Sequence, residues 1–279
     1  MFISTVHEFE NLEKLKKSGI DGIIIGIPFF SIRQSNLVEI DDLKKWKERC
    51  MELDMKLYIN FLRLIPEQKI EEVSSILKIC KELDIDGIYF SDEGVLYKAM
   101  EIGYEDHLIY QPETLVANSM DVDFYLNQNL LSVSLCHELS LEELLTIASN
   151  YSNVEVLVHG YFSILYSRRP LVTNYLHVLK KDSPLPCRFD IIEQTRKGRM
   201  PIVQDESGTH VFSEVPIGSY DEIAALKESG IKRFRIDSIF FDDEYTVKVM
   251  NGYRNGIVED TQYSNHWYHQ ETIKKKGDM

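Results

Sequence analysis

One phrase recurs three times in the chain and places the strongest limit on its fold. Residues 12–26 read LEKLKKSGIDGIIIG, residues 79–91 read ICKELDIDGIYFS, and residues 225–237 read ALKESGIKRFRID. Each is the end of a helix, a tight turn and a short, largely apolar strand, and Gly19 and Gly230 suit the left-handed position that closes a helix. Such joints connect helices to the strands of a parallel sheet that is buried on both faces.

Eight such strands alternate with helices, and this order predicts a (β/α)8 barrel of the TIM type. We expect strands at residues 2–6, 22–27, 56–61, 87–91, 107–111, 130–135, 154–158 and 233–237. We expect helices at residues 7–18, 41–54, 69–84, 93–103, 118–128, 140–150 and 219–229. Ser140-x-x-Glu143 and Ser219-x-x-Glu222 fit capping boxes at two helix starts. A doubly wound open sheet is disfavoured because no G-x-G-x-x-G turn follows the first strand.

The connection after the seventh strand is unusually long. That strand ends at His159-Gly160, and residues 161–218, which include Arg168-Arg169, show no clear helical period. A connection of this length inside a compact domain is usually functional. Short strand-like runs lie within it at residues 187–192, 202–203 and 210–212. We therefore expect residues 161–218 to form a small lid over the barrel mouth.

Length and composition are those of an ordinary globular protein. The chain has 279 residues, of which 44% are hydrophobic and 27% charged, and we divide it into one barrel domain at residues 1–258, lid included, and a C-terminal tail at residues 259–279. No apolar run reaches the ~18–20 residues that span a bilayer, and the N-terminus lacks the pattern of a signal peptide. We expect a cytoplasmic protein without membrane contact. The net charge of −14 repels polyanions, so contact with nucleic acid requires a local patch or a partner.

Functional residues of such a barrel gather where the strands end, on the face formed by the βα loops. Histidine and carboxylate side chains at strand ends suit acid–base chemistry. The candidates for catalysis are His137, His159 and Asp237. A structural hydrogen bond is the alternative role for His137. No metal site is expected, since Leu141 stands where the H-E-x-x-H pattern that would start at His137 needs its second histidine.

A second set of strand-end and lid residues suits ligand binding. Its members are Arg33, Asn60, Glu113, Tyr166, Arg169 and Asn174. Arg169 is the preferred anchor for a carboxylate or phosphate, because the planar guanidinium forms two parallel hydrogen bonds with such groups. Equally, Arg168 and Arg169 could bind carboxylates of the lid itself. From these residues alone the chemistry stays unassigned.

Several segments together resemble one known family. Residues 91–96, SDEGVL, resemble a D-P-G-V-L turn, and residues 136–143, CHELSLEE, resemble A-R-E-L-S-L-E-E. Residues 156–176 resemble the signature F-V-H-G-A-L-C-x-x-Y-S-G-R-C-x-L-S-N-Y, and residues 186–189, PCRF, resemble Q-P-C-R-W. These are motifs of the U32 family of peptidases, the collagenase-like proteases, and the resemblance covers nearly the whole chain. Its members of known function hydroxylate tRNA wobble uridine or ubiquinone precursors without oxygen.

The chain departs from that family where the family holds its cofactor. Such members carry four cysteines that bind an iron–sulfur cluster. Here Ser163 and Pro170 occupy the first two of these positions, the fourth falls near Gly218, and only Cys187 remains. Serine and proline cannot supply the thiolates that the cluster needs. We therefore expect that the cluster is lost and that the chain has no cofactor.

The resemblance leaves three functions open. Short and long family members often occur in pairs, which favours a cluster-less partner subunit of a tRNA wobble-uridine hydroxylation complex. Its partner would be a longer, cluster-bearing paralogue that contacts the tRNA. A collagenase-like peptidase ranks lower, because no nucleophile with its base and no closed set of metal ligands is visible. The third function is a barrel that binds a small anionic metabolite through Arg33 and Arg169.

Overall fold

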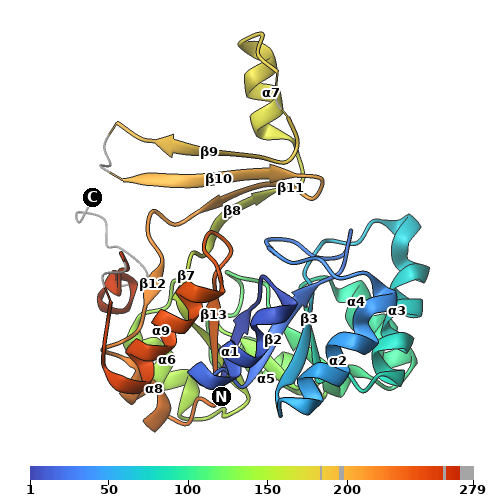
Figure 1. Ribbon diagram of the computed structural model, residues 1–279, viewed down its shortest axis with the longest axis vertical. Helices are drawn as coiled ribbons and strands as arrows, with labels where there is room; N and C mark the ends of the chain where they lie inside the picture. Colours follow the sequence, from blue (N-terminus) through green and yellow to red (C-terminus); the bar gives the residue numbers. More distant parts are fainter. Residues whose placement is uncertain (183, 195–197, 260–261, 271–279) are drawn as a thin grey trace.

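The computed structural model describes residues 1–182, 184–194, 198–259 and 262–270 (Figure 1). Eight parallel strands form a closed barrel, because β6 and β13 both pair with β7, and β13 also pairs with β1. These strands are β1 (Phe2–Thr5), β2 (Gly22–Gly26), β3 (Lys56–Phe61), β4 (Gly87–Phe90), β5 (Leu108–Tyr110), β6 (Ser132–Ser134), β7 (Val154–Gly160) and β13 (Arg233–Asp237). The predicted (β/α)8 barrel is confirmed.

Helices surround the barrel and bury their apolar faces against its outer side. They are α1 (Leu12–Ser18), α2 (Leu43–Glu52), α3 (Ile70–Glu82), α4 (Glu93–Glu101), α5 (Ser119–Leu126), α6 (Leu141–Ala148), α8 (Ile223–Glu228) and α9 (Asp243–Asn255). Short 3-10 turns are η1 (Phe9–Asn11), η2 (Ile40–Asp42), η3 (Glu67–Lys69), η4 (Glu105–His107) and η5 (His266–His269). Gly19 closes α1 with a φ of 107°, as its sequence predicts. The sequence reading missed α9, which begins where the Asp242 side chain accepts a hydrogen bond from the Tyr245 amide.

One of the two predicted capping boxes is present. Ser140 and Glu143 form it at the start of α6. The prediction at Ser219 is wrong, because α8 begins only at Ile223 and no side-chain hydrogen bond caps it. The Glu222 carboxylate of the predicted box instead accepts from the Asn265 side-chain amide (3.0 Å) and lies 2.9 Å from the His269 Nε2.

Within residues 161–218, four described strands form a separate antiparallel sheet in the order β8-β11-β10-β9, which stands above the barrel (Figure 1). Its strands are β8 (Ser163–Ser167), β9 (Cys187–Ile192), β10 (Arg199–Asp205) and β11 (Gly208–Phe212), and β12 (Ile217–Gly218) returns to pair with β7. We keep the name lid for residues 161–218. The lid also contains the helix α7 (Leu171–Val178), so the prediction of no helix there is wrong.

Arg63 connects the lid to the barrel. Its guanidinium donates to the carbonyl of Phe29 in the β2 loop (2.9 Å) and to the carbonyl of Glu206 in the β10–β11 turn (2.7 Å). It also lies over the Phe29 ring, 4.0 Å from the centroid. The hairpin turn is therefore held on the barrel mouth.

Part of the predicted tail packs on the barrel. Tyr268 is buried, and its hydroxyl lies 2.7 Å from the Ser219 hydroxyl. Residues 260–261 and 271–279 of that tail lie outside the described residues. Among the described residues, none of the helices has the length and apolar character needed to cross a membrane.

Candidate functional site

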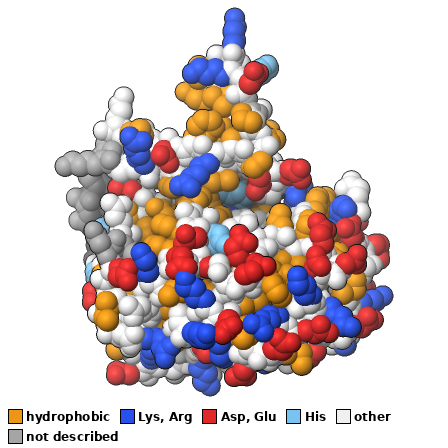
Figure 2. Space-filling view, in the orientation of Figure 1, with side chains coloured by type: hydrophobic (Ala, Val, Ile, Leu, Met, Phe, Trp, Pro, Cys, Tyr) orange, Lys and Arg blue, Asp and Glu red, His pale blue; other side chains and the backbone are white. Residues whose placement is uncertain are grey.

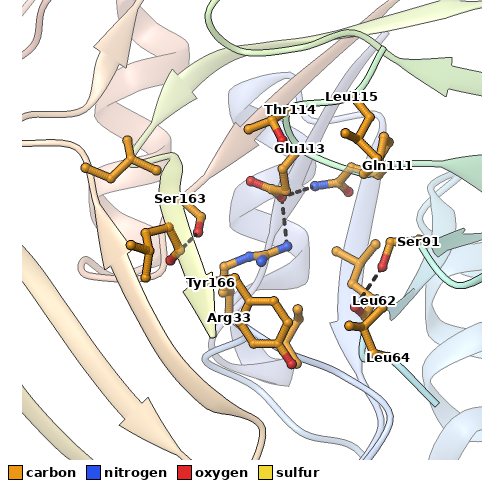
Figure 3. Close-up of a pocket in the computed structure, with 14 residues that line it drawn as sticks. Arg33, Leu62, Leu64, Ser91, Gln111, Glu113, Thr114, Leu115, Ser163 and Tyr166 are labelled. Atoms are coloured by element: carbon orange, nitrogen blue, oxygen red, sulfur yellow. Dashed lines mark hydrogen bonds and ion pairs between the residues drawn. The ribbon is translucent and has the colours of Figure 1, made fainter. Parts of the chain in front are cut away.

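A cavity of about 320 Å³ lies at the barrel mouth, between the βα loops and strand β8 of the lid (Figure 3). We call it the mouth cavity. Leucine and isoleucine side chains supply most of its apolar wall. Its polar lining includes Arg33, Ser91, Gln111, Glu113 and Ser163. The site therefore combines an apolar wall with a few convergent polar groups, as small-molecule sites do.

Arg33 and Glu113 form a buried ion pair at this cavity. The Arg33 Nη2 donates to the Glu113 Oε1 at 2.8 Å, and the side chains are only 10% and 14% exposed. Both residues have a left-handed backbone, with φ values of 53° and 72°. That conformation costs about 1–2 kcal/mol at a residue other than glycine. Strained residues are often found at functional sites, but five further non-glycine residues of the described chain also have a positive φ.

The ion pair sets the charge of the mouth cavity. Burial alone would raise the pKa of Glu113, but the neighbouring Arg33, His137 and Arg235 outweigh burial and lower that pKa to about 2. Glu113 is thus ionised at neutral pH and neutralises Arg33. The Gln111 amide also donates to the Glu113 Oε1 (2.9 Å). An anionic ligand at Arg33 would therefore share the guanidinium with the Glu113 carboxylate.

A second, much smaller cavity lies inside the barrel, and Arg33 and Gln111 line both cavities. Its volume of about 10 Å³ is close to what one water molecule requires. Asp237 lines it, and among the described residues the buried Asp237 Oδ1 has no hydrogen-bond partner. Burial raises the pKa of Asp237 to about 6. This carboxyl group can hold or release a proton near neutral pH, as a general acid or base must.

Asn60 also lines the inner cavity, but its side chain is engaged by the chain itself. Its amide donates to the Ile32 carbonyl (2.8 Å) and to the Gln34 side chain (3.2 Å). Its Oδ1 accepts from the Leu62 amide at 3.2 Å. Asn60 therefore fixes the β2 loop that carries Arg33.

His137 lies behind Glu113 and lines neither cavity. Its Nε2 lies 3.1 Å from the Arg235 Nη2, and because arginine can only donate, the His137 proton is on Nδ1. That Nδ1 is 3.6 Å from the Glu113 Oε2. Burial lowers the pKa of His137 to about 4, so the ring is neutral. The hydrogen bond with Arg235 suits the structural alternative for His137, whereas its buried Nδ1 has no hydrogen-bond partner among the described residues.

The structure does not place His159 at the mouth. The pairing of β7 with β13 shifts register after Leu157, which pairs with Arg235, so that His159 and not Val158 pairs with Ile236. This bulge turns the His159 side chain to the outer face of the barrel. There its Nε2 lies 2.7 Å from the Tyr245 hydroxyl. Burial lowers its pKa to about 3.

Of the three lid residues predicted to bind a ligand, only one lies at the mouth cavity. Tyr166 lines the mouth cavity, and its hydroxyl donates to the Ser207 carbonyl (3.0 Å). Arg169 and Asn174 are exposed and line neither mouth cavity nor inner cavity. The structure does not bring them to the mouth, since Arg169 precedes α7, Asn174 lies on it, and α7 projects away from the barrel (Figure 1).

Inside the barrel lies a charged cluster that the sequence reading missed. Glu155 is fully buried; it accepts from the Tyr89 hydroxyl at 2.7 Å and forms ion pairs with Arg233 (3.3 Å) and Arg235 (3.7 Å). A signal was available, since Arg233, Arg235 and Asp237 alternate with apolar residues in β13. A two-residue period places all three on the inner face of the barrel.

Comparison with known proteins decides the family. The model of peptidase family U32 matches residues 7–276. The chain belongs to the U32 peptidase family. This U32 chain is 25% identical over 249 residues to the tRNA hydroxylation protein P2 of Bacillus subtilis, covering 87% of the chain and 81% of that protein. It is 22% identical over 288 residues to the collagenase of Porphyromonas gingivalis, covering 97% and 68%.

A solved structure of the same family shares the fold. The U32 peptidase Mk0906 aligns with a TM-score of 0.52 and 11% identity over 85% of this chain and 92% of that one. At this identity the likeness concerns the fold alone.

The cysteines of this U32 chain do not fit the cluster that the family resemblance implies. Cys50 and Cys80 lie on the separate helices α2 and α3, and burial raises the pKa of each thiol to about 12. In the signature segment, Ser163 lies on β8 and Pro170 precedes α7. The described part of the chain contains no group of three or more His, Cys, Asp or Glu residues placed to hold a metal ion. Loss of the cluster remains a prediction.

Proposed function

We propose that this U32 protein is the cluster-less partner subunit of a complex that hydroxylates the wobble uridine of tRNA. One observation carries the proposal: the family fold and signature segment are retained, while Ser163 and Pro170 stand at signature cysteine positions. The similarity to a tRNA hydroxylation protein over 87% of the chain supports it. A longer paralogue would then hold the cluster, and it would supply most tRNA contacts because this chain carries a net charge of −14.

In such a complex the mouth cavity is the place for a small polar ligand. Arginine has five N–H donors, and among the described residues one hydrogen bond from the Arg33 side chain goes to Glu113. The other donors are left for acceptor atoms of a ligand. Asp237 lines the smaller cavity inside the barrel, next to Arg33, and its carboxyl group can exchange a proton. The strain at Arg33 and Glu113 makes ligand binding in this cavity the second candidate function of the chain.

A peptidase needs a nucleophile next to a base, and the lid does hold a serine beside a histidine. The hydrogen bonds of this pair, however, run in the wrong direction for catalysis. Ser207 lies 3.1 Å from the His210 Nε2. However, the Ser207 hydroxyl donates to the Asp205 Oδ1 at 2.6 Å, so His210 donates to Ser207 and cannot take its proton. Burial also lowers the pKa of His210 to about 4. A base that activates the serine needs the opposite arrangement.

Deletion of the gene in its native host tests the proposal. We expect the hydroxylated wobble uridine, measured by mass spectrometry of isolated tRNA, to fall to background and to return with the wild-type gene. A tagged copy should co-purify with a longer U32 paralogue that has all four signature cysteines. As a control, Met120→Ser changes a 70% exposed residue of α5 and should restore the modification. An unchanged modification level in the deletion strain, or a tagged protein that purifies alone, would show the proposal to be wrong.

A further inference from the structure

Helix α7 carries an apolar face that is open to solvent. Leu171, Tyr175, Val178 and Leu179 follow helical spacing along α7 and its last turn, and they are 39%, 64%, 80% and 47% exposed. The helix projects from the lid away from the barrel (Figure 1), and a hydrophobic cluster is visible on the projecting lobe in Figure 2. An apolar stripe at this spacing normally packs against another element, and its exposure marks an interaction site.

The helix is fixed at its first turn by the lid sheet. The Gln204 Oε1 accepts from the amides of Val172 (2.9 Å) and Thr173 (3.2 Å), and the Thr209 Oγ1 accepts from the amide of Leu171 (3.0 Å). Gln204 and Thr209 are fully buried. They satisfy three of the four amide groups that a helix start leaves unpaired. The apolar face is therefore presented in a preformed helix, which lowers the entropy lost on binding.

Basic side chains flank the apolar face on an otherwise acidic protein. Residues 168–188 contain five basic residues and one acidic residue, which gives this segment a net charge of +4. The whole chain has a net charge of −14, so the remaining residues together carry −18. The basic residues are Arg168, Arg169, Lys180, Lys181 and Arg188, and all five are exposed. Two of them precede the helix and two follow it. A partner surface that fits this helix is apolar in the middle and acidic at its rim.

The charges also separate the possible partners. Packing of α7 against the same helix of a second copy would place Arg168 and Arg169 against Lys180 and Lys181 in the antiparallel arrangement, and each basic pair against itself in the parallel one. Nucleic acid bases stack on aromatic rings, so RNA gains little from an aliphatic residue such as Val178. Amphipathic helices that seat in a groove of another protein use anchors at the spacing seen here.

We propose that α7 docks into an apolar groove with an acidic rim on a different protein chain. The identity of that chain rests on the proposed function: it is the longer U32 paralogue with four signature cysteines. The exposed face of α7 supplies the anchors, and the flanking basic residues set the orientation by pairing with carboxylates of the groove.

Binding measurements with the purified longer paralogue test this proposal. The double variant Tyr175→Ser/Val178→Ser removes the two most exposed anchors and should weaken binding at least ~10-fold, as loss of central anchors does. The matched control is Met51→Ser/Met120→Ser, which removes two residues that are 66% and 70% exposed on α2 and α5 and should leave the affinity unchanged. Circular dichroism verifies that each variant is folded.

A charge variant tests the rim separately. Lys180→Glu/Lys181→Glu should weaken binding to the paralogue, and the loss should shrink at high salt because the interaction is screened. Host tRNA and phosphatidylglycerol vesicles are the further probes, and neither should bind in a way that depends on Tyr175 and Val178.

The outcomes distinguish this inference from the proposed function. If the paralogue binds the Tyr175→Ser/Val178→Ser variant as tightly as the wild type, the docking inference is wrong while the partner-subunit proposal stands. If tRNA, vesicles or a second copy of the chain binds through Tyr175 and Val178, the inference is also overturned. If the unaltered chains do not associate, the partner-subunit proposal fails and the inference fails with it.

Discussion

Replacing Asp237 by asparagine should stabilise the protein, and only at higher pH. The pKa of Asp237 is raised to about 6 by burial, against about 3.9 for an ordinary aspartate. Because the folded protein disfavours the ionised carboxylate, the free energy of unfolding falls as the pH rises from about 4, where Asp237 ionises in the unfolded chain, through 6, where it ionises in the folded one. With 1.36 kcal/mol for each pKa unit, the loss above pH 7 is up to about 3 kcal/mol. Asparagine cannot ionise, so Asp237→Asn escapes it.

Urea unfolding at a series of pH values measures this effect. The free energy of unfolding of Asp237→Asn should equal that of the wild type near pH 4 and exceed it by up to about 3 kcal/mol above pH 7, with an unchanged dependence on urea concentration. Glu82→Gln, a change at an exposed residue of α3, is the control and should show no such pH dependence. A difference that does not vary with pH, or a variant less stable than the wild type above pH 7, would mean that Asp237 has a stabilising partner in the folded protein.

Three other predictions concern the barrel interior and the family chemistry. Glu155→Gln should lower the free energy of unfolding by about 3–5 kcal/mol, because it leaves Arg233 and Arg235 without their buried anionic partner. The control Glu71→Gln changes a side chain that is 87% exposed and should lower it by less than about 1 kcal/mol. Equal losses for the two variants in urea unfolding would contradict the reasoning. The chain purified without oxygen and supplied with iron and sulfide should stay colourless, and an absorption band near ~400 nm with stoichiometric iron would show a cluster. No cleavage of gelatin, collagen or casein is expected, whereas activity that co-elutes with the protein and disappears in His137→Ala would support a peptidase.

The fold was predictable because its signals are local. Each barrel strand is a short apolar run after a turn, and Gly19 closes α1 as its position implies. Helix α7 escaped prediction because its first turn is capped by Gln204, 32 residues from Val172 in the sequence, and not by a neighbouring side chain. Register is also invisible locally, so the bulge that turns His159 outward could not be foreseen.

The candidate site was predictable in part. Arg33 and Glu113 follow strand ends, and a barrel brings strand ends to one mouth although these residues are 80 positions apart. Their ion pair was not predictable, because it is set by the conformations of two loops, and both residues have a left-handed backbone. Nor did the sequence show that Arg169 would lie outside the mouth, just before the start of α7.

The hydrogen bonds that hold α7 connect it to the barrel mouth through the lid sheet. The residues that hold its first turn, Gln204 and Thr209, flank the same β10–β11 turn that Arg63 binds through Glu206. Arg63 in turn binds the β2 loop, which carries Arg33. The β10–β11 hairpin therefore lies between the projecting helix and the loop that carries Arg33. A protein bound to α7 would thus be joined to the β2 loop at the mouth through this hairpin and Arg63.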